Sequence, residues 1–115
     1  LTHLSNAIGT ILPIPEIAAI CRAHGIPLVV DGSQGAVHLP VDVQALGCDF
    51  YCFTGHKTYG PTGSGILWGK REWLEKLPPY EGGGEMIVNV TEDTVTYNDP
   101  PHRFEAGTPA IIEAV

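Results

Sequence analysis

The chain has 115 residues, of which 43% are hydrophobic and 17% charged, and its formal net charge at pH 7 is −7. This apolar content predicts a folded core and excludes a disordered chain, while the acidic balance excludes a basic nucleic-acid surface and a polybasic membrane patch. No apolar run approaches the ~20 residues of a membrane span, and no secretory signal pattern is visible. Three cysteines without disulfide-scaffold spacing favour a reducing compartment, which predicts a cytoplasmic location.

Hydrophobic periodicity and turn residues predict alternating helices and strands in the first half of the chain. Pro13 and Pro15 suit the first turn of a helix that Gly25 ends, and the apolar run 26–31 indicates a strand buried on both faces. Further along we expect a short helix over 42–46 capped by Asp42, strands over 49–53 and 66–68, glycine-rich loops over 60–65 and 81–84, a helix over 71–77 and an exposed polar excursion over 91–101. This order predicts an α/β unit with a parallel sheet.

Each of the first two predicted strands leads into a group of polar residues. Asp31 ends the first strand and Gln34 follows it, whereas Thr54, His56 and Lys57 follow the second. Ligands of α/β sheets bind outside the carboxyl ends of the strands, so we expect these five side chains to share one edge. Taken singly, Asp31 could be a loop cap, His56 a satisfied polar residue and Lys57 a solvated surface lysine.

Lys57 stands between a buried strand and a glycine loop, which is an unusual place for a solubilising charge. In a partly apolar crevice its amine becomes a better nucleophile, able to form a Schiff base with an aldehyde cofactor. A facing carboxylate such as Asp31 would keep a pyridinium nitrogen protonated, and Thr54, His56 and loop N–H groups would hold a phosphate. Together these are the requirements of pyridoxal 5′-phosphate (PLP).

Other chemical motifs fail on spacing. A P-loop needs glycine directly before its lysine, where His56 stands, and the loop 63–65 does not complete G-x-G-x-x-G because Trp68 holds the last glycine position. Cys48 and Cys52 would lie ~13 Å apart along a strand, too far to share one zinc ion. We therefore predict no metal site, and we expect the three cysteines in the core.

Two stretches carry a family resemblance. Residues 30–34, Val-Asp-Gly-Ser-Gln, and 53–63, Phe-Thr-Gly-His-Lys-Thr-Tyr-Gly-Pro-Thr-Gly, resemble the class V aminotransferase family of PLP enzymes, and are most similar to its group II (SufS-like) cysteine desulfurases. Further matching pieces are residues 2–6, 40–46, 78–84 and 103–109. The resemblance implies that residues 1–115 form part of the large, PLP-binding domain of a fold-type I transferase, with a mostly parallel sheet and flanking helices. A start without methionine and an end inside an apolar run also predict a segment of a larger protein.

The resemblance also implies roles at the ring of the cofactor. Lys57 matches the catalytic lysine that holds PLP covalently and moves protons at the substrate α-carbon. Asp31 matches the partner of the pyridinium nitrogen, and Gln34 the residue that hydrogen-bonds the phenolic oxygen. Asn6 matches a residue that lies near the substrate carboxylate and the ring.

The remaining matches concern the phosphate. Thr54 and His56 resemble the family's phosphate cradle. Gly82 and Thr108 match positions that reach the phosphate of the other subunit in the family dimer. The resemblance therefore implies a homodimer whose sites are shared between subunits.

The family reaction takes sulfur from L-cysteine, or selenium from selenocysteine, and leaves alanine. The sulfur passes to a separate enzyme cysteine as a persulfide, and then toward iron–sulfur clusters and other sulfur cofactors, in some cases through an acceptor protein. That cysteine has no match here, so we expect the isolated segment to be inactive. Two alternatives stay open: selenocysteine lyase or another class V enzyme, and a non-catalytic α/β remnant that acts in dimerisation.

Overall fold

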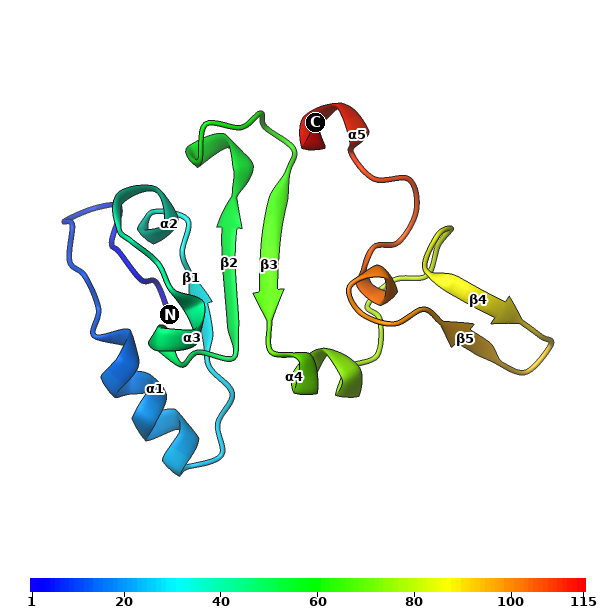
Figure 1. Ribbon diagram of the computed structural model, residues 1–115, viewed down its shortest axis with the longest axis horizontal. Helices are drawn as coiled ribbons and strands as arrows, with labels where there is room; N and C mark the ends of the chain where they lie inside the picture. Colours follow the sequence, from blue (N-terminus) through cyan, green and yellow to red (C-terminus); the bar gives the residue numbers. More distant parts are fainter. The chain divides into compact units, whose positions relative to one another are not determined.

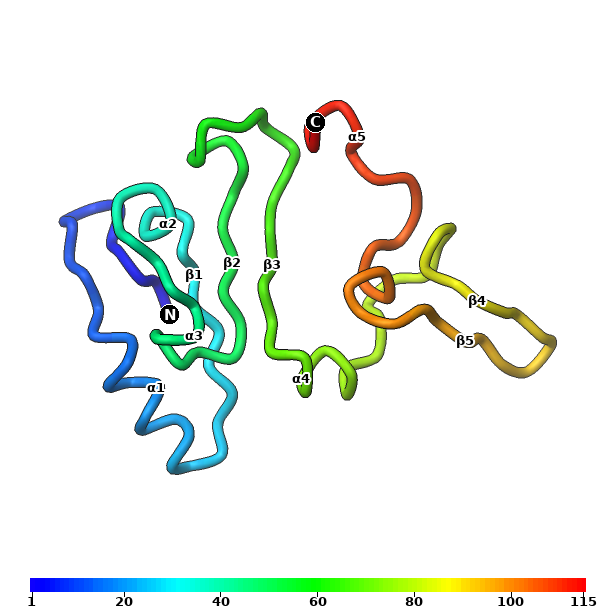
Figure 2. The backbone as a smooth tube through the Cα atoms, in the orientation of Figure 1, coloured from blue at the N-terminus to red at the C-terminus, as the bar shows by residue number.

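The computed structural model describes residues 1–115, which divide into two compact units, residues 1–69 and 70–115 (Figure 1). The elements of the first unit are α1 (Ile14–Ala23), β1 (Val29–Asp31), α2 (Gly35–His38), α3 (Val43–Leu46), β2 (Phe50–Thr54), the 3₁₀ helix η1 (Gly55–Lys57) and β3 (Gly65–Gly69). Figure 2 traces the loop that leads from the first residues of the chain into α1. The alternating helices and strands predicted for this half are confirmed.

The helix α1 lies where the periodicity predicts it. A proline occupies its first turn, where no intrahelical N–H bond is lost, and Gly25 follows its end at φ +66°, a conformation that glycine adopts without strain. Ile14 and Ala18 are four residues apart and therefore share one face, and both are buried. This face is the one that α1 contributes to the core.

The three-stranded sheet has the order β1-β2-β3. β1 and β2 are parallel, with Val30 opposite Tyr51, as predicted. β3 is antiparallel to β2, with Tyr51 opposite Trp68, which the expectation of a mostly parallel sheet allows. The ten residues 55–64 between β2 and β3 are too few for the crossover of a dozen or more residues that a parallel pair requires.

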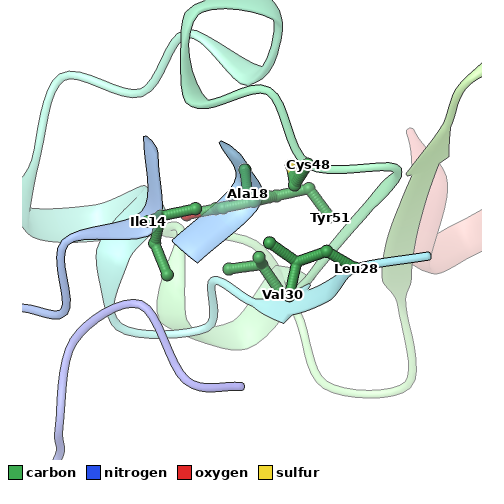
Figure 3. Packing of buried hydrophobic residues seen from close by; sticks show 6 residues of the cluster. All are labelled: Ile14, Ala18, Leu28, Val30, Cys48 and Tyr51. Atoms are coloured by element: carbon green, nitrogen blue, oxygen red, sulfur yellow. The ribbon is translucent and has the colours of Figure 1, made fainter. Parts of the chain in front are cut away.

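The core of the first unit lies between α1 and one face of this sheet (Figure 3). Its buried side chains are those of Ile14, Ala18, Leu28, Val30, Cys48 and Tyr51. The predicted core position is confirmed for Cys48, whereas Cys21 and Cys52 are only half-buried. Cys21 packs against the edge of the core cluster, and Cys52 alternates along β2 onto the other face of the sheet from Tyr51.

Two short helices join β1 to β2. The predicted helix over 42–46 is confirmed as α3, whose N-terminus is capped by Asp42 and which ends at Gly47 in the left-handed region, at φ +72°. The segment Gly32–Gly35 runs directly into α2, which the sequence patterns do not predict. Four residues carry too little periodicity to reveal such a helix.

We expect Asp42→Ala to lower the free energy of unfolding by about 1 kcal/mol, the usual cost of losing a helix cap. The reason is that one carboxylate oxygen of Asp42 accepts hydrogen bonds from the N–H groups of Gln44, at 2.9 Å, and Ala45, at 3.1 Å. Urea denaturation measures the difference. Asp42→Asn is the matched control, since an amide oxygen can cap as well; a loss of equal size in both variants would contradict the cap as the cause.

The second unit contains α4 (Arg71–Lys76), β4 (Ile87–Val90), β5 (Val95–Tyr97), the 3₁₀ helix η2 (His102–Phe104) and α5 (Ile111–Ala114). The predicted helix over 71–77 is confirmed as α4. The excursion expected over 91–101 is largely exposed, but it holds β5, which pairs with β4 as an antiparallel hairpin. The turn between these strands is closed by Thr91, whose N–H donates to the carbonyl of Thr94 at 2.8 Å.

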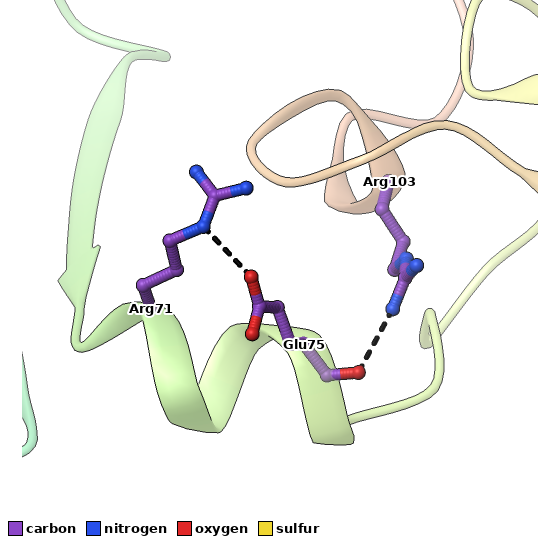
Figure 4. A network of polar contacts seen from close by, with 3 residues as sticks. All are labelled: Arg71, Glu75 and Arg103. Atoms are coloured by element: carbon purple, nitrogen blue, oxygen red, sulfur yellow. Dashed lines mark hydrogen bonds and ion pairs between the residues drawn. The ribbon is translucent and has the colours of Figure 1, made fainter.

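Two polar contacts involve Glu75, one within α4 and one with the segment after the hairpin (Figure 4). Nε of Arg71 lies 2.7 Å from a carboxylate oxygen of Glu75, one turn further along the helix. Nη1 of Arg103 donates to the backbone carbonyl of Glu75 at 3.1 Å, and so satisfies an acceptor near the end of α4 that has no intrahelical partner.

None of the helices has the length and apolar character that a membrane span requires.

Candidate active site

Two parallel strands bring most of the predicted polar residues to one edge of the sheet. Asp31 lies opposite Cys52, and the N–H of Gly32 donates to the Cys52 carbonyl at 2.7 Å. Two residues further on, Thr54 ends β2, and η1 then carries His56 and Lys57. The arrows of β1 and β2 in Figure 1 point the same way, so both groups lie at the carboxyl edge of the sheet, as predicted.

The carboxylate of Asp31 is held by the turn that follows it. One of its oxygens accepts a hydrogen bond from the Ser33 N–H at 2.9 Å. Hydrogen bonds from Ser33 lower the pKa of Asp31 below its ordinary value, and the nearby Lys57 ammonium adds a smaller lowering effect. Asp31 is therefore an anion at neutral pH, and it lies within electrostatic reach of Lys57.

We expect the stabilising effect of the Asp31 carboxylate to depend on pH. A depressed pKa in the folded state adds stability above the unfolded pKa, about 3.9, which is lost as the pH falls through the folded value. Asp31→Asn should therefore lower the free energy of unfolding at pH 7 and have no such effect below the folded pKa. Urea denaturation at both pH values measures this.

The control for this pH dependence is Lys57→Met. It should retain most of the wild-type dependence, because the hydrogen bonds from Ser33 are the larger cause of the lowered pKa of Asp31. If the dependence disappeared in Lys57→Met, the charge of Lys57 rather than the turn would be the main cause of the lowered pKa of Asp31.

Asn6 and Gln34 meet although they are distant in the sequence. The amide Nε2 of Gln34 donates a hydrogen bond to Oδ1 of Asn6. Asn6 is presented by a tight turn in which the Ser5 hydroxyl accepts from the N–H groups of Ala7 and Ile8, at 3.3 and 3.4 Å. The structure thus brings together two amides that the resemblance assigns to the same cofactor.

The hydroxyl of Thr54 is buried and has no hydrogen-bond partner. Buried polar atoms are satisfied in the great majority of cases, and leaving one unsatisfied costs about 1–3 kcal/mol. An unsatisfied hydroxyl at the carboxyl edge of a sheet is therefore an observation that points to a missing ligand atom. A phosphate oxygen is one acceptor that would satisfy it.

The loop after Lys57 is tightly constrained. A Cβ on Gly55 would lie 2.1 Å from the Ser64 hydroxyl and 3.3 Å from the Ser64 carbonyl oxygen, so a side chain there would force Ser64 to shift. Oγ1 of Thr58 donates back to the carbonyls at Thr54 and Gly55, at 3.1 and 3.0 Å. Tyr59 follows with φ +66° and an exposed side chain. Such strain in a non-glycine residue concentrates at functional loops.

The other two predicted residues belong to the second unit. Gly82 is exposed, and Thr108 lines a cavity of about 420 Å³ whose wall also includes Glu85, His102 and Glu105. The N–H of Gly107 donates to the Gly84 carbonyl at 3.0 Å, so the loops that carry Gly82 and Thr108 are joined. The cofactor roles of all eight predicted residues stay predictions, and the geometry groups six of them in one unit and two in the other.

Sequence reasoning missed a buried polar pair below this edge, formed by His3 and Tyr51. A signal was present, because Tyr51 lies inside an apolar strand and a buried tyrosine hydroxyl needs a partner. No three His, Cys, Asp or Glu side chains of the chain lie close enough together to hold a metal ion.

This α/β unit carries a lysine, a carboxylate and an unsatisfied hydroxyl at the carboxyl edge of its parallel strands, which is the edge where ligands of α/β sheets bind. Comparison with known proteins defines the family. The model of the aminotransferase class-V family matches residues 1–115, and the chain belongs to this family.

Three proteins similar to this chain are named as cysteine desulfurases, one of them as probable. A probable cysteine desulfurase of Xylella fastidiosa (strain 9a5c) is 57% identical over 111 residues, which are 96% of this chain and 27% of the relative. The crystal structure of the cysteine desulfurase CsdA from Escherichia coli matches with a TM-score of 0.94 and 45% identity, over 97% of this chain and 28% of that one. A cysteine desulfurase from Thermococcus onnurineus NA1 matches with a TM-score of 0.91 and 41% identity, over 98% and 28%.

The chain therefore spans about a quarter of the length of the relatives it matches. The predicted fold class, an α/β part of a fold-type I PLP-dependent transferase, is confirmed by these structural matches.

Proposed function

We propose that this chain is the lysine-bearing part of a PLP-dependent cysteine desulfurase of group II, which takes sulfur from L-cysteine and leaves alanine. The observation that carries the proposal is that Asp31 and Lys57 lie at one edge of the sheet, within electrostatic reach of each other, beside the unsatisfied Thr54 hydroxyl. Relatives named cysteine desulfurase that are 56–57% identical support the choice of reaction. The proposal includes a homodimer in the cytoplasm and transfer of the sulfur to an acceptor protein.

The residues present fit PLP, the cofactor of the class V family. Lys57 would hold its aldehyde carbon, Asp31 its ring nitrogen, and Thr54 with His56 its phosphate. The Thr54 hydroxyl is buried and lacks a partner, so a phosphate oxygen would remove a cost that the fold otherwise bears. When bound, PLP supplies an electron sink for chemistry at the α-carbon of an amino acid.

The side chains of this chain have separate tasks in that chemistry. Asp31 stays ionised at neutral pH, so it can accept a hydrogen bond from a protonated ring nitrogen and stabilise its charge. The hydrogen-bonded amides of Gln34 and Asn6 would orient the ring and the substrate carboxylate. The amine of Lys57, once displaced by the substrate, would take the proton from the α-carbon.

A cofactor titration tests the proposal directly. PLP is added to the purified chain, absorbance near the Schiff-base band is followed, and the adduct is reduced with borohydride and located by peptide mass mapping. The expected result is one label per chain, on Lys57. Label shared with Lys70 and Lys76, or the absence of a band, would contradict a formed cofactor site.

The reaction is tested in a chimaera. Residues 1–115 replace the matching segment of the Escherichia coli cysteine desulfurase CsdA, which they cover with a TM-score of 0.94. We expect the chimaera to release alanine from L-cysteine. A chimaera that folds and binds PLP but turns over only selenocysteine, or neither amino acid, would contradict the desulfurase assignment.

A further inference from the structure

A buried polar pair lies directly beneath the turn that carries the candidate ring-binding residues. His3 and Tyr51 expose only 6% and 1% of their surface. Nδ1 of His3 lies 3.0 Å from the hydroxyl of Tyr51, and the two rings meet edge to face at 85° with centroids 5.9 Å apart. Burial lowers the pKa of His3 and raises the pKa of Tyr51 to about 12, so both groups are neutral at pH 7 and their hydrogen bond is intact there.

The backbone of the turn rests on these two rings. A Cβ on Gly32 would lie 2.0 Å from Cε1 and Cζ of Tyr51, and a Cβ on Gly35 would lie 2.7 Å from Nδ1 of His3 and 2.9 Å from the Tyr51 hydroxyl. Both glycines are therefore places where backbone and ring approach more closely than any side chain would permit. The rings of His3 and Tyr51 therefore limit how closely the backbone of the turn can approach the core.

His3 also holds the start of the same turn through its backbone. Its N–H donates to the Asp31 carbonyl at 2.8 Å. Successive strand residues point to opposite faces, so Val30 and Tyr51 face the core while the Asp31 side chain faces away from it. The pair thus contacts the backbone of the turn from the core side, and the Asp31 carboxylate lies on the opposite side of the sheet.

We propose that the hydrogen-bonded His3–Tyr51 pair is a positioning device that fixes the Gly32–Gly35 turn and, through it, the carboxylate of Asp31 and the amide of Gln34. The part of this inference that concerns the cofactor rests on the proposed function. A purely apolar pair could fill the same volume, but only the hydrogen bond locks both rings in one orientation, and removing one partner leaves the other buried and unsatisfied.

The first test needs no cofactor and measures amide hydrogen exchange in the purified chain. Tyr51→Phe should accelerate exchange at Gly32, whose N–H donates to Cys52, and at Ala36, whose N–H donates to Gly32, by about tenfold. Exchange at Leu46, whose N–H donates to the Asp42 carbonyl in α3, should not change. Equal acceleration at all three amides would overturn the proposal, because the pair would then stabilise the whole fold and not the turn. No acceleration at any of them would also overturn it, because the pair would then not stabilise the turn.

Matched variants separate the hydrogen bond from packing. His3→Leu should reproduce the effect of Tyr51→Phe, whereas His3→Asn should restore slow exchange because its amide reaches the position of Nδ1. The double variant His3→Leu/Tyr51→Phe should be no worse than either single change, since the same bond is lost once. Tyr97→Phe, in β5 of the other unit, is the control and should change none of these rates. A double variant whose effects add would overturn the proposal.

The second test measures PLP affinity in the same variants. Tyr51→Phe and His3→Leu should weaken PLP binding by about tenfold, the effect of one lost hydrogen bond, and His3→Asn should restore it. Equal affinity in all variants would overturn the cofactor part of the inference. If the wild-type chain takes up no PLP, it forms no cofactor site by itself, and the exchange rates alone decide whether the pair fixes the turn.

Discussion

Lys57→Ala is expected to abolish the covalent attachment of PLP to this chain. Lys57 is half-buried at the end of η1, at the same sheet edge as Asp31, whereas the other two lysines lie in the second unit. In the variant, the absorbance band of the Schiff base should not form, and borohydride should leave no reduced adduct. In the chimaera with the Escherichia coli enzyme, alanine release should fall by on the order of 10³-fold or more, because the group that moves the α-proton is gone.

Two lysines serve as controls for this loss. Lys76 lies 5.4 Å from the centre of the Trp73 ring, a cation–π contact that gives it a structural role in the second unit. Lys76→Ala and Lys70→Ala should therefore keep the label on Lys57 at full stoichiometry. A Lys57→Ala chain that still yields one reduced adduct, on whichever lysine, would refute Lys57 as the attachment site.

The elements around the candidate site were predictable because their signals are local. Apolar runs followed by polar residues located β1 and β2, although β1 is buried only at Val30 and not on both faces as predicted. The parallel pairing then implied a shared edge for Asp31 and Lys57. The cap at Asp42 located the start of α3 correctly. These features depend on a few neighbouring residues and on the period of the chain, which a sequence displays directly.

What the sequence did not reveal depends on contacts between distant residues. The hydrogen bond between Gln34 and Asn6 and the one between Tyr51 and His3 each join segments that only the fold brings together. The antiparallel direction of β3 follows from the short loop that connects it to β2, and the residue types alone do not indicate this constraint. The hairpin of β4 and β5 was missed because its turn, closed by the side chain of Thr91, lacks the Asn-Gly or Asp-Gly signal that marks two-residue turns.

Gly32→Ala is expected to be the most destabilising single methyl group that can be added to this turn. The new Cβ would lie 2.0 Å from two ring atoms of Tyr51 and 2.2 Å from its hydroxyl. The ring cannot move aside freely, because it is almost fully buried and hydrogen-bonded to His3. We expect a loss of about 3 kcal/mol in the free energy of unfolding, the upper range for overpacking a core, measured by urea denaturation.

A glycine of the same sheet gives the matched control. A Cβ on Gly65, in β3, meets only the Phe53 carbonyl, at 3.6 Å, so Gly65→Ala should cost far less than Gly32→Ala. A second background isolates the clash itself: in Tyr51→Leu the ring atoms are absent, and adding Gly32→Ala should then cost much less than it does beside tyrosine. If Gly32→Ala is equally costly in both backgrounds, its effect comes from the backbone of the turn and not from contact with the ring. In that case the Gly32–Gly35 turn would be fixed by its own hydrogen bonds, and the ring of Tyr51 would not limit how closely this turn approaches the core.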